Sequence, residues 1–177
     1  MCRAELPVRA RKGTRFCSTR CRVRAHRARV PTELRSIDRW VTHSPQKVPL
    51  TPDDRLASST DPATWSPYAA VRRLDRRGFV LAGDGIVCLD LDHCLVGGAL
   101  TEQAAQIVAR CPDTYIEVSP SGDGLHIWGR GNVRRGRKVA GVEVYGTGRY
   151  ITVTGIRFAK SRPVLGDLSD LIVWLLA

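Results

Sequence analysis

The stretch that most restricts the fold is IVCLDLD at residues 86–92, because it combines an apolar strand with two acids in alternation. Side chains alternate between the two faces of a strand, so Asp90 and Asp92 leave one face while Leu89 and Leu91 leave the other. Two carboxylates held this close repel each other, and each loses hydration if the strand is buried. A bound cation would offset both costs, whereas a pair of solvated acids on an exposed strand needs none.

Three further segments show the same division into an apolar and a polar face. Their apolar positions are Leu125, Ile127, Val142, Val144, Ile151 and Val153. Their polar positions are His126, Trp128, Glu143, Tyr145, Tyr150 and Thr152. We expect helices to cover the apolar face, and the polar face to stay open for a ligand. The predicted fold class is therefore α+β, an antiparallel-rich sheet with helices packed on one face.

Helix signals lie on both sides of the acidic strand. Residues 66–78 predict a helix that ends at Gly78, and residues 101–110 predict a second with Thr101 as its N-cap. Residues 168–176 are expected to form a final helix that packs on the domain, with a docking face for a separate protein as the alternative.

Two turn signals predict hairpins. The turn PSGD separates TYIEVS (114–119) from GLHIWG (124–129). The turn GTG separates AGVEVYG (140–146) from RYITVTG (149–155). Short turns of this composition join antiparallel neighbours, so each pair is expected to be adjacent in the sheet.

Charge and composition divide the chain into three parts. Of the 28 Lys and Arg residues in the 177-residue chain, ten lie in residues 1–30 beside one acid, Glu5. The net charge of +11 therefore divides into +9 for this arm and +2 for the rest, which favours a polyanion such as nucleic acid as partner. We predict a basic Cys/His arm at 1–30, a lead-in segment at 31–66 and a core with a C-terminal helix at 67–177.

The number of cysteines and the length of the apolar runs predict the cellular compartment of the protein. No apolar run is long enough to cross a bilayer, and the basic N-terminus lacks the apolar stretch of a signal peptide. Six cysteines without such a signal predict the reducing cytoplasm, with thiols or metal sites rather than disulfides. Cys88, Cys94 and Cys111 lack the spacing of metal ligands and are expected to be buried thiols.

The arm has residues that suit a zinc site, namely Cys2, Cys17, Cys21 and His26. Three thiols and one imidazole can hold tetrahedral Zn²⁺, and metal binding would supply folding energy to a segment too small for a core. The alternative is a partly helical basic arm with free thiols. In either case its arginines are expected to bind nucleic-acid backbone.

The polar face of the sheet predicts a second kind of metal site. Asp90, Asp92 and Glu143 are hard oxygen ligands of the type that Mg²⁺ and Mn²⁺ prefer, and these ions often bridge carboxylates to substrate phosphates. Two ions roughly 3.5–4 Å apart can activate an attacking hydroxyl and stabilise a leaving pyrophosphate.

Two neighbouring segments add groups that suit an anionic ligand. In SPSGDGLHIW (119–128), a Gly-Ser turn precedes His126, which shares the face of the acids and could donate a hydrogen bond to a triphosphate. A structural histidine in a hairpin is the alternative. A basic cluster before the strand of Glu143 predicts contact with a nucleic-acid backbone, with a solvated loop as the alternative: Arg134, Arg135, Arg137 and Lys138.

Together, CLDLDHC, SPSGDGLHIW and GVEVYGTGRYITVTG resemble the three motifs of the archaeo-eukaryotic primase superfamily. The likeness is greatest to the bifunctional DNA primase–polymerase (prim-pol) domains of phages and plasmids. The upstream KVPLTPDDRLASSTDPATW resembles that group's lead-in, where a Lys-x-Pro run and a later Trp precede the catalytic core. The resemblance covers most of the chain and implies an RRM-like sheet. It also implies a nucleotidyltransferase that makes or extends a primer on single-stranded DNA from nucleoside triphosphates.

The resemblance also implies roles for single residues. Asp90, Asp92 and Glu143 would be the catalytic ligands of Mg²⁺ or Mn²⁺, with Glu143 standing where many relatives have Asp. Nucleotide contacts are implied for His126, Ser121, Gly122, Arg149 and Lys47. A separate replicative helicase is implied as a further partner, and the cytoplasm of a bacterial host as the compartment.

Two other functions remain open at this point. A replication protein that binds single-stranded or origin DNA without catalysis would keep the fold, but a pure DNA binder gains nothing from three acids that face its ligand. A metal-dependent nuclease would use the same ions on a phosphodiester, but it has no need of a triphosphate contact at His126.

Overall fold

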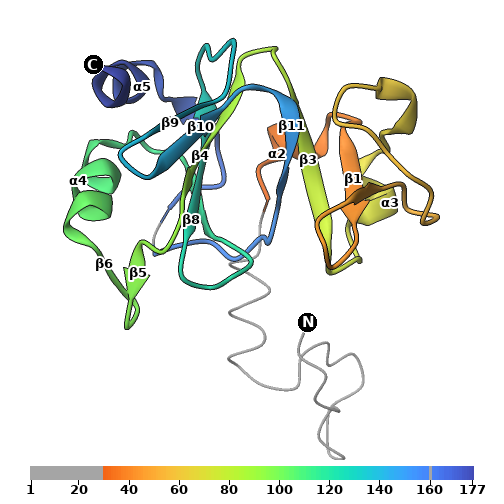
Figure 1. Ribbon diagram of the computed structural model, residues 1–177, viewed down its shortest axis with the longest axis horizontal. Helices are drawn as coiled ribbons and strands as arrows, with labels where there is room; N and C mark the ends of the chain where they lie inside the picture. The colour runs from red at the N-terminus through yellow and green to blue at the C-terminus, as the bar shows by residue number, and fades with distance from the viewer. Residues whose placement is uncertain (1–29, 160) are drawn as a thin grey trace, which may run out of the picture.

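The computed structural model describes residues 30–159 and 161–177, which form two main sheets (Figure 1). The smaller sheet has the order β11-β3-β1-β2 and comprises β1 (Trp40–His43), β2 (Pro49–Leu50), β3 (Arg77–Ala82) and β11 (Thr147–Thr152). The larger sheet has β8 and β4 at its centre and comprises β4 (Ile86–Leu91), β7 (Tyr115–Val118), β8 (Leu125–Arg130), β9 (Arg137–Val139), β10 (Val142–Tyr145) and β12 (Gly166–Asp167). All its pairings are antiparallel except that of β12 with β8.

Short elements complete the described part of the chain. A hairpin of β5 (Leu95–Val96) and β6 (Ala99–Leu100) stands apart from both sheets. The helical elements are α2 (Thr32–Arg35), the 3-10 turn η1 (Pro62–Thr64), α3 (Tyr68–Val71), α4 (Glu102–Arg110) and α5 (Ser169–Leu176). Across the described residues, no helix has the length and apolar character needed to traverse a bilayer.

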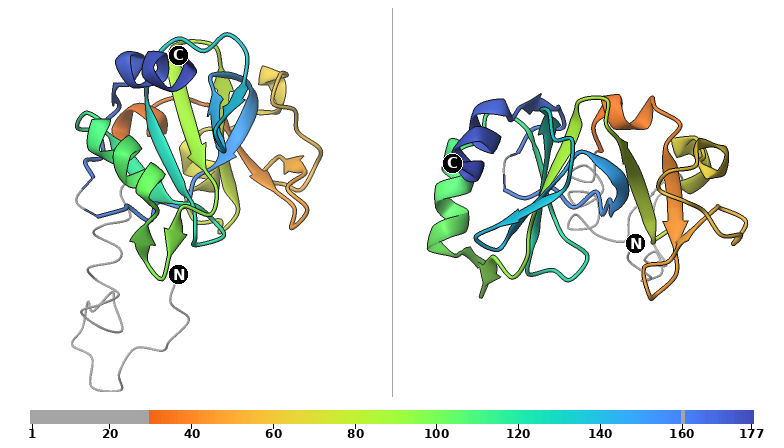
Figure 2. Two further views of the ribbon diagram at one scale, coloured as in Figure 1. Left: turned by 60° about the vertical axis from the view of Figure 1, so that its left-hand side comes forward. Right: turned by 45° about the horizontal axis from the view of Figure 1, so that its top comes forward.

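One face of the larger sheet is covered by helices, as the sequence predicts. Helices α4 and α5 lie against this face (Figures 1 and 2). The buried cluster beneath them contains Leu89, Leu91, Leu125, Ile127, Val142 and Val144 from the sheet and Ala104, Ile107, Leu171 and Ile172 from the helices. The α+β fold class and the alternation of the three central strands are therefore confirmed.

The opposite face of the larger sheet is not open along its whole length. Trp128 packs edge-on against Phe79 of the smaller sheet, with ring centroids 6.1 Å apart. Phe79 and Trp128 belong to a second buried cluster, between the two sheets. Ile151 and Val153 lie in this cluster, whereas the sequence predicted that they face the helices. The expectation was wrong because the polar face is polar only in part. The residues at its other positions are large enough and apolar enough to bury: Cys88, Tyr115, Trp128 and Tyr145.

The second predicted hairpin is also wrong. β10 pairs with β4 and β9 in the larger sheet, whereas β11 pairs with β3 in the smaller one. The chain changes sheets at Gly146, where an added Cβ would lie 2.5 Å from the carbonyl oxygen of Val133. Gly148 follows with a φ of +67°, which a non-glycine residue rarely adopts. The glycines of GTG therefore allow a crossover between sheets and not a tight hairpin.

The predicted helix at 66–78 is shorter than expected. α3 ends at Val71, and Gly78 lies inside β3 opposite Val41 and Thr152. The ring of Tyr150 covers Gly78 so closely that a Cβ there would be 2.4 Å from the ring. Gly78 is therefore a packing glycine of a strand, not the end of a helix.

The other predicted elements are confirmed. β7 and β8 form the predicted hairpin, α4 begins after Thr101 as N-cap, and the final helix packs on the domain. Cys88 and Cys94 are buried and Cys111 is half-buried. Burial raises the pKa of Cys94 and of Cys111 to about 11, as expected of unreactive thiols.

An ion pair fastens the turn that leads from one sheet to the other. Arg39, which is buried beside the ring of Phe79, donates two hydrogen bonds to Asp84 in the turn between β3 and β4, at 3.0 and 2.5 Å. Burial alone would raise the pKa of Asp84, but the hydrogen bonds and charge of Arg39 lower it overall. The charged form of Asp84 therefore stabilises the folded state.

We expect Asp84→Asn to lower the free energy of unfolding by about 1 kcal/mol at pH 7, a value reduced for the half-exposed carboxylate. Because the folded-state pKa of Asp84 is lower than the unfolded one, the difference from wild type should be full above pH 5 and should be lost as the pH falls through the folded-state pKa. Urea denaturation of wild type and variant, at pH 7 and at a series of pH values below 5, measures this difference in the free energy of unfolding. Asp113→Asn, in an exposed pair with Arg162, should change stability by less than half as much; an equal loss would contradict the expectation.

Candidate active site

Five charged or titratable residues of the larger sheet form a single row across five neighbouring strands. Reading from β9 to β7, the paired positions are Lys138, Glu143, Asp90, His126 and Glu117. Residues paired across strands point to the same face and have Cβ atoms roughly 4.5–5.5 Å apart. We call these five residues the charged row. Glu143 and His126 thus share a layer with Asp90 and flank it directly, as the sequence predicts.

His126 lies in the row between two carboxylates. It is 4% exposed, and its Nδ1 is 3.4 Å from Glu117 Oε1 while its Nε2 is 3.5 Å from Asp90 Oδ1. Burial lowers the pKa of this imidazole, but the hydrogen bond to Glu117 and the charges of Glu117 and Asp90 together raise it above the ordinary value. The ring therefore presents Nε2 toward the acids of the site.

Asp90 carries a buried oxygen without a hydrogen bond. Its Oδ1 has no hydrogen-bond donor in the described structure, although the side chain as a whole is 21% exposed. Burial is the largest influence on its pKa and raises it; the charges of Asp92 and Glu143 raise it further, and those of His126 and Lys47 lower it. A buried carboxylate oxygen without a hydrogen bond is costly, and its one ion-pair partner among the described residues is His126 Nε2 at 3.5 Å, so this position suits a cation.

Glu143 is engaged by protein donors. Tyr145 donates to its Oε2 at 2.5 Å, and Lys138 Nζ lies 3.0 Å from its Oε1. The hydrogen bond from Tyr145 is the main reason that the pKa of Glu143 lies below its usual range, and Lys138 lowers it further. Within the part of the chain that the structure describes, no three His, Cys, Asp or Glu side chains stand close enough to form a metal site.

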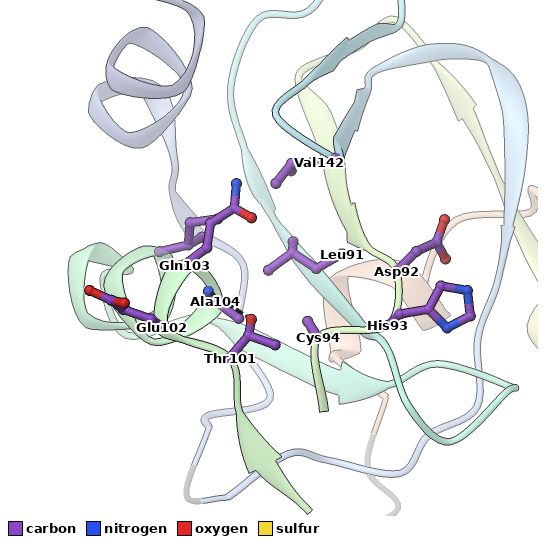
Figure 3. A pocket seen from close by; sticks show the side chains of 11 residues that line it. Leu91, Asp92, His93, Cys94, Thr101, Glu102, Gln103, Ala104 and Val142 are labelled. Atoms are coloured by element: carbon purple, nitrogen blue, oxygen red, sulfur yellow. Dashed lines mark hydrogen bonds between the residues drawn. The ribbon is translucent and has the colours of Figure 1, made fainter. Parts of the chain in front are cut away.

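Asp92 follows the end of β4 and is exposed beside His93. Both side chains point away from α4, on the far side of the backbone from Leu91 (Figure 3). A pocket of about 430 Å³ lies between this turn and the start of α4, and Asp92 and His93 are among the residues that line it, although the side chain of Asp92 extends to the side opposite Leu91 (Figure 3). Asp92 therefore shares the side of the charged row, one residue beyond the strand.

The SPSGDG loop lies beside this turn. His93 Nδ1 is 2.6 Å from Asp123 Oδ2, and Ser121 donates a hydrogen bond to the other oxygen of Asp123. Gly122 has a φ of +89° and nothing near its Cα on the side-chain side. Ser121 and Gly122 are exposed, but the Ser121 hydroxyl is hydrogen-bonded to Asp123 and Ser119, and the Gly122 amide donates to the Ser119 carbonyl oxygen. Their contact with a nucleotide therefore stays a prediction.

Two predicted cations lie near the row, and a third belongs to it. Lys47 acts on Asp90 through its charge, and its carbonyl oxygen accepts a hydrogen bond from Tyr150. Arg149 lies with its guanidinium 4.5 Å from the centre of the Tyr145 ring, and its charge reaches Glu143. Lys138, predicted to bind nucleic acid, is paired with Glu143 and so belongs to the row.

The other basic residues predicted to bind nucleic acid lie on the loop that precedes β9 and at the first residue of β9. Arg134, Arg135 and Arg137 are exposed, and none of them forms an ion pair with another described residue. The predicted zinc ligands, Cys2, Cys17, Cys21 and His26, lie outside the described residues, so that site stays a prediction.

Sequence reasoning missed Glu117. It is fully buried and occupies the end of the charged row. Its signal is an acid at the centre of the apolar segment TYIEVS, with the same alternation as Tyr115 and directly opposite His126 in the hairpin.

The profile described as "Bifunctional DNA primase/polymerase, N-terminal" matches residues 9–164. The chain belongs to this family. Membership confirms the resemblance seen in the three motifs and the class of enzyme, nucleotidyltransferase, that the resemblance implies.

A curated relative supports the same assignment. A protein of Nitratiruptor phage NrS-1 named DNA Primase-polymerase is 36% identical over 133 residues. The aligned region is 66% of this chain and 18% of the relative, so the chain spans about a fifth of that protein.

Proposed function

We propose that this prim-pol domain catalyses template-directed nucleotidyl transfer for DNA replication, by making or extending a primer from nucleoside triphosphates. The observation that carries the proposal is the charged row. In this row Asp90, whose buried Oδ1 accepts no hydrogen bond, is paired with Glu143 on one side and His126 on the other. A carboxylate pair and an imidazole on adjacent strands suit a ligand that combines divalent cations with phosphate groups.

The acids of the site would hold the cations. Asp90 and Asp92 fit Mg²⁺ or Mn²⁺ by donor type, and Asp90 by its unsatisfied oxygen. Glu143 would join them after exchanging its present partners, Lys138 and Tyr145. When bound in a pair, such ions lower the pKa of an attacking 3′-hydroxyl and neutralise charge on the triphosphate.

The other residues would bind and orient the nucleotide. His126 directs Nε2 toward Asp90. From this nitrogen it would donate a hydrogen bond to a phosphate oxygen. Lys47 and Arg149 bring positive charge from the smaller sheet, and Ser121 and Gly122, exposed on the neighbouring loop, would exchange their bonds within the loop for contacts to the nucleotide. These contacts would align the α-phosphate with the primer terminus, so catalysis would depend on positioning and charge neutralisation.

The template would lie along the basic loop, with the arm at residues 1–30 adding further contacts to the backbone. Arg134, Arg135 and Arg137 are suited to this role because they are exposed and have no acidic partner among the described residues.

Replacing these three arginines with alanine should weaken binding of single-stranded DNA and flatten its salt dependence. Each lost phosphate contact reduces the slope of log K against log salt by about 0.7, so the slope should fall by up to about 2. Fluorescence anisotropy with a labelled oligonucleotide across a salt series measures this. Alanine replacement of Arg72, Arg73 and Arg76, on the loop between α3 and β3, removes the same charge and should leave the slope unchanged. Equal slopes for both triple variants would contradict the assignment.

Nucleotide incorporation tests the proposed function directly. Wild type, incubated with a single-stranded template, labelled nucleotides and Mn²⁺, should form extended product, and Asp90→Ala/Asp92→Ala should form none. Equally little label in both would overturn the catalytic proposal and favour a DNA-binding protein. Degradation of the template without added nucleotide, lost in the double variant, would instead identify a nuclease.

A further inference from the structure

We propose that Glu117 is a positioning residue that acts on the nucleotide through His126. The inference rests on the proposed function, because it assigns His126 to the triphosphate. Glu117 itself is fully buried behind the imidazole, on the side away from Asp90, so it does not touch the reacting groups.

The carboxylate of Glu117 is surrounded by hydrogen-bond donors. Trp128 Nε1 lies 3.2 Å and His126 Nδ1 3.4 Å from its Oε1. Its Oε2 accepts from the Tyr115 hydroxyl and the Gly155 amide, both at 2.8 Å. The Thr154 hydroxyl lies 3.1 Å from the same oxygen, but its single proton has a nearer acceptor in the Val118 carbonyl oxygen at 2.8 Å. These donors come from β7, β8 and the segment after β11, so the carboxylate has one position.

This donor set matches a carboxylate and no other side chain of similar size. An ionised carboxylate is acceptor-only and has about four lone-pair sites, whereas an amide has one acceptor oxygen and adds two donors. Burying a charge costs several kcal/mol unless such bonds compensate it. A fold that needed only to fill this space could do so with an apolar residue, which suggests a role for the charge.

The consequence for His126 is a fixed ring. Because Nδ1 is held toward Glu117, Nε2 must face Asp90, from which it is 3.5 Å. The hydrogen bond at one ring nitrogen decides what the other can offer. Glu117 thus keeps Nε2 directed at the place that the proposed function gives to the triphosphate.

The first test observes the ring without nucleotide. Wild type should show a single set of His126 ring ¹⁵N signals with an Nδ1-bound proton protected from exchange, identified by its absence in His126→Ala. In Glu117→Gln the amide can accept from Nδ1 or donate to it, so a second ring state should appear. An unprotected Nδ1 proton in wild type, or an unaltered spectrum in Glu117→Gln, would overturn the proposal.

The second test measures affinity for a fluorescent ATP with Mg²⁺ and no template. Loss of a charge-assisted hydrogen bond should make His126→Ala bind about 10-fold or more weakly, and Glu117→Gln should bind several-fold more weakly. Because Glu117 acts through His126, the double variant should match His126→Ala within about twofold. Fully additive losses would show an independent role and overturn the proposal.

A matched control separates positioning from stability. Tyr115→Phe removes one donor to Oε2 but leaves the contact between Oε1 and His126. It should lower the melting temperature and leave affinity and ring signals unchanged; a loss of affinity equal to that of Glu117→Gln would show a merely structural effect. If His126→Ala binds ATP like wild type, the triphosphate contact of the proposed function is overturned, and the ring signals still decide whether Glu117 positions His126.

Discussion

Asp90→Asn is expected to abolish nucleotide incorporation and at the same time to make the domain more stable. Activity should fall by about 10³-fold or more, because the substitution removes the central carboxylate of the charged row. Stability should rise by about 1 kcal/mol, which is a shift of roughly 2–4 °C in melting temperature for a chain of this size. The two effects have opposite signs, so loss of activity cannot be ascribed to unfolding.

The gain in stability follows from the surroundings of Asp90. Its Oδ1 is buried without a hydrogen bond, and burial and the nearby acids raise its pKa by more than the charges of His126 and Lys47 lower it, so the folded state disfavours the charged form. An amide of the same shape removes both the repulsion and the loss of charge hydration. Thermal unfolding and primer extension on one preparation measure both effects. Asp113→Asn, an exposed site, should leave activity unchanged; a destabilised Asp90→Asn would contradict the electrostatic account.

Gly129→Ala is expected to be the most destabilising of the single substitutions considered, at about 3 kcal/mol. Gly129 lies in β8 beneath the point where β12 and the start of α5 meet the larger sheet. An added Cβ would be 2.5 Å from the Gly166 carbonyl oxygen and 2.5 Å from Leu168 Cγ. The first of these atoms is backbone, so the contact is relieved only by moving β12 away from β8.

The neighbouring Gly131→Ala provides the contrast. Its Cβ would meet Ile172 Cδ1 at 2.7 Å, the tip of a side chain that can change rotamer. Chemical denaturation should therefore show less than half the loss found for Gly129→Ala. Equal losses would mean that β12 yields as easily as a side chain, contrary to the expectation.

The sequence predicts the central strands well because each has one face against helices. The alternation of Leu89 and Leu91 is unambiguous, and it carries Asp90 to the opposite face without any tertiary information. The segment 149–153 has the same alternation of apolar and polar residues. This alternation does not specify which of two sheets a strand joins. The crossover at Gly146 depends on close approach to Val133, a contact between residues 13 apart in the sequence.

In the candidate site, too, some features could be predicted from the sequence and others could not. Neighbours of Asp90 are set by strand register, so Glu143 and His126 could be predicted from parity and motif order. The pairing of Lys138 with Glu143 could not, because an exposed lysine has several partners within reach and the packed structure selects one. Glu117 was missed for a related reason: burial of an acid is explained only by the donors that converge on it from other segments.

The residues of the charged row occupy directly paired positions on adjacent strands, and this limits where the chain can change in length. Slipping β10 by one residue against β4 would replace Glu143 beside Asp90 with Val142 or Val144 and turn the acid toward the helices. Insertions or deletions inside β4, β8 or β10 would therefore destroy the site even if the sheet still formed. Changes in length should be tolerated in the connections at the strand ends, such as the hairpin tip at residues 97–98, which set no register within the row.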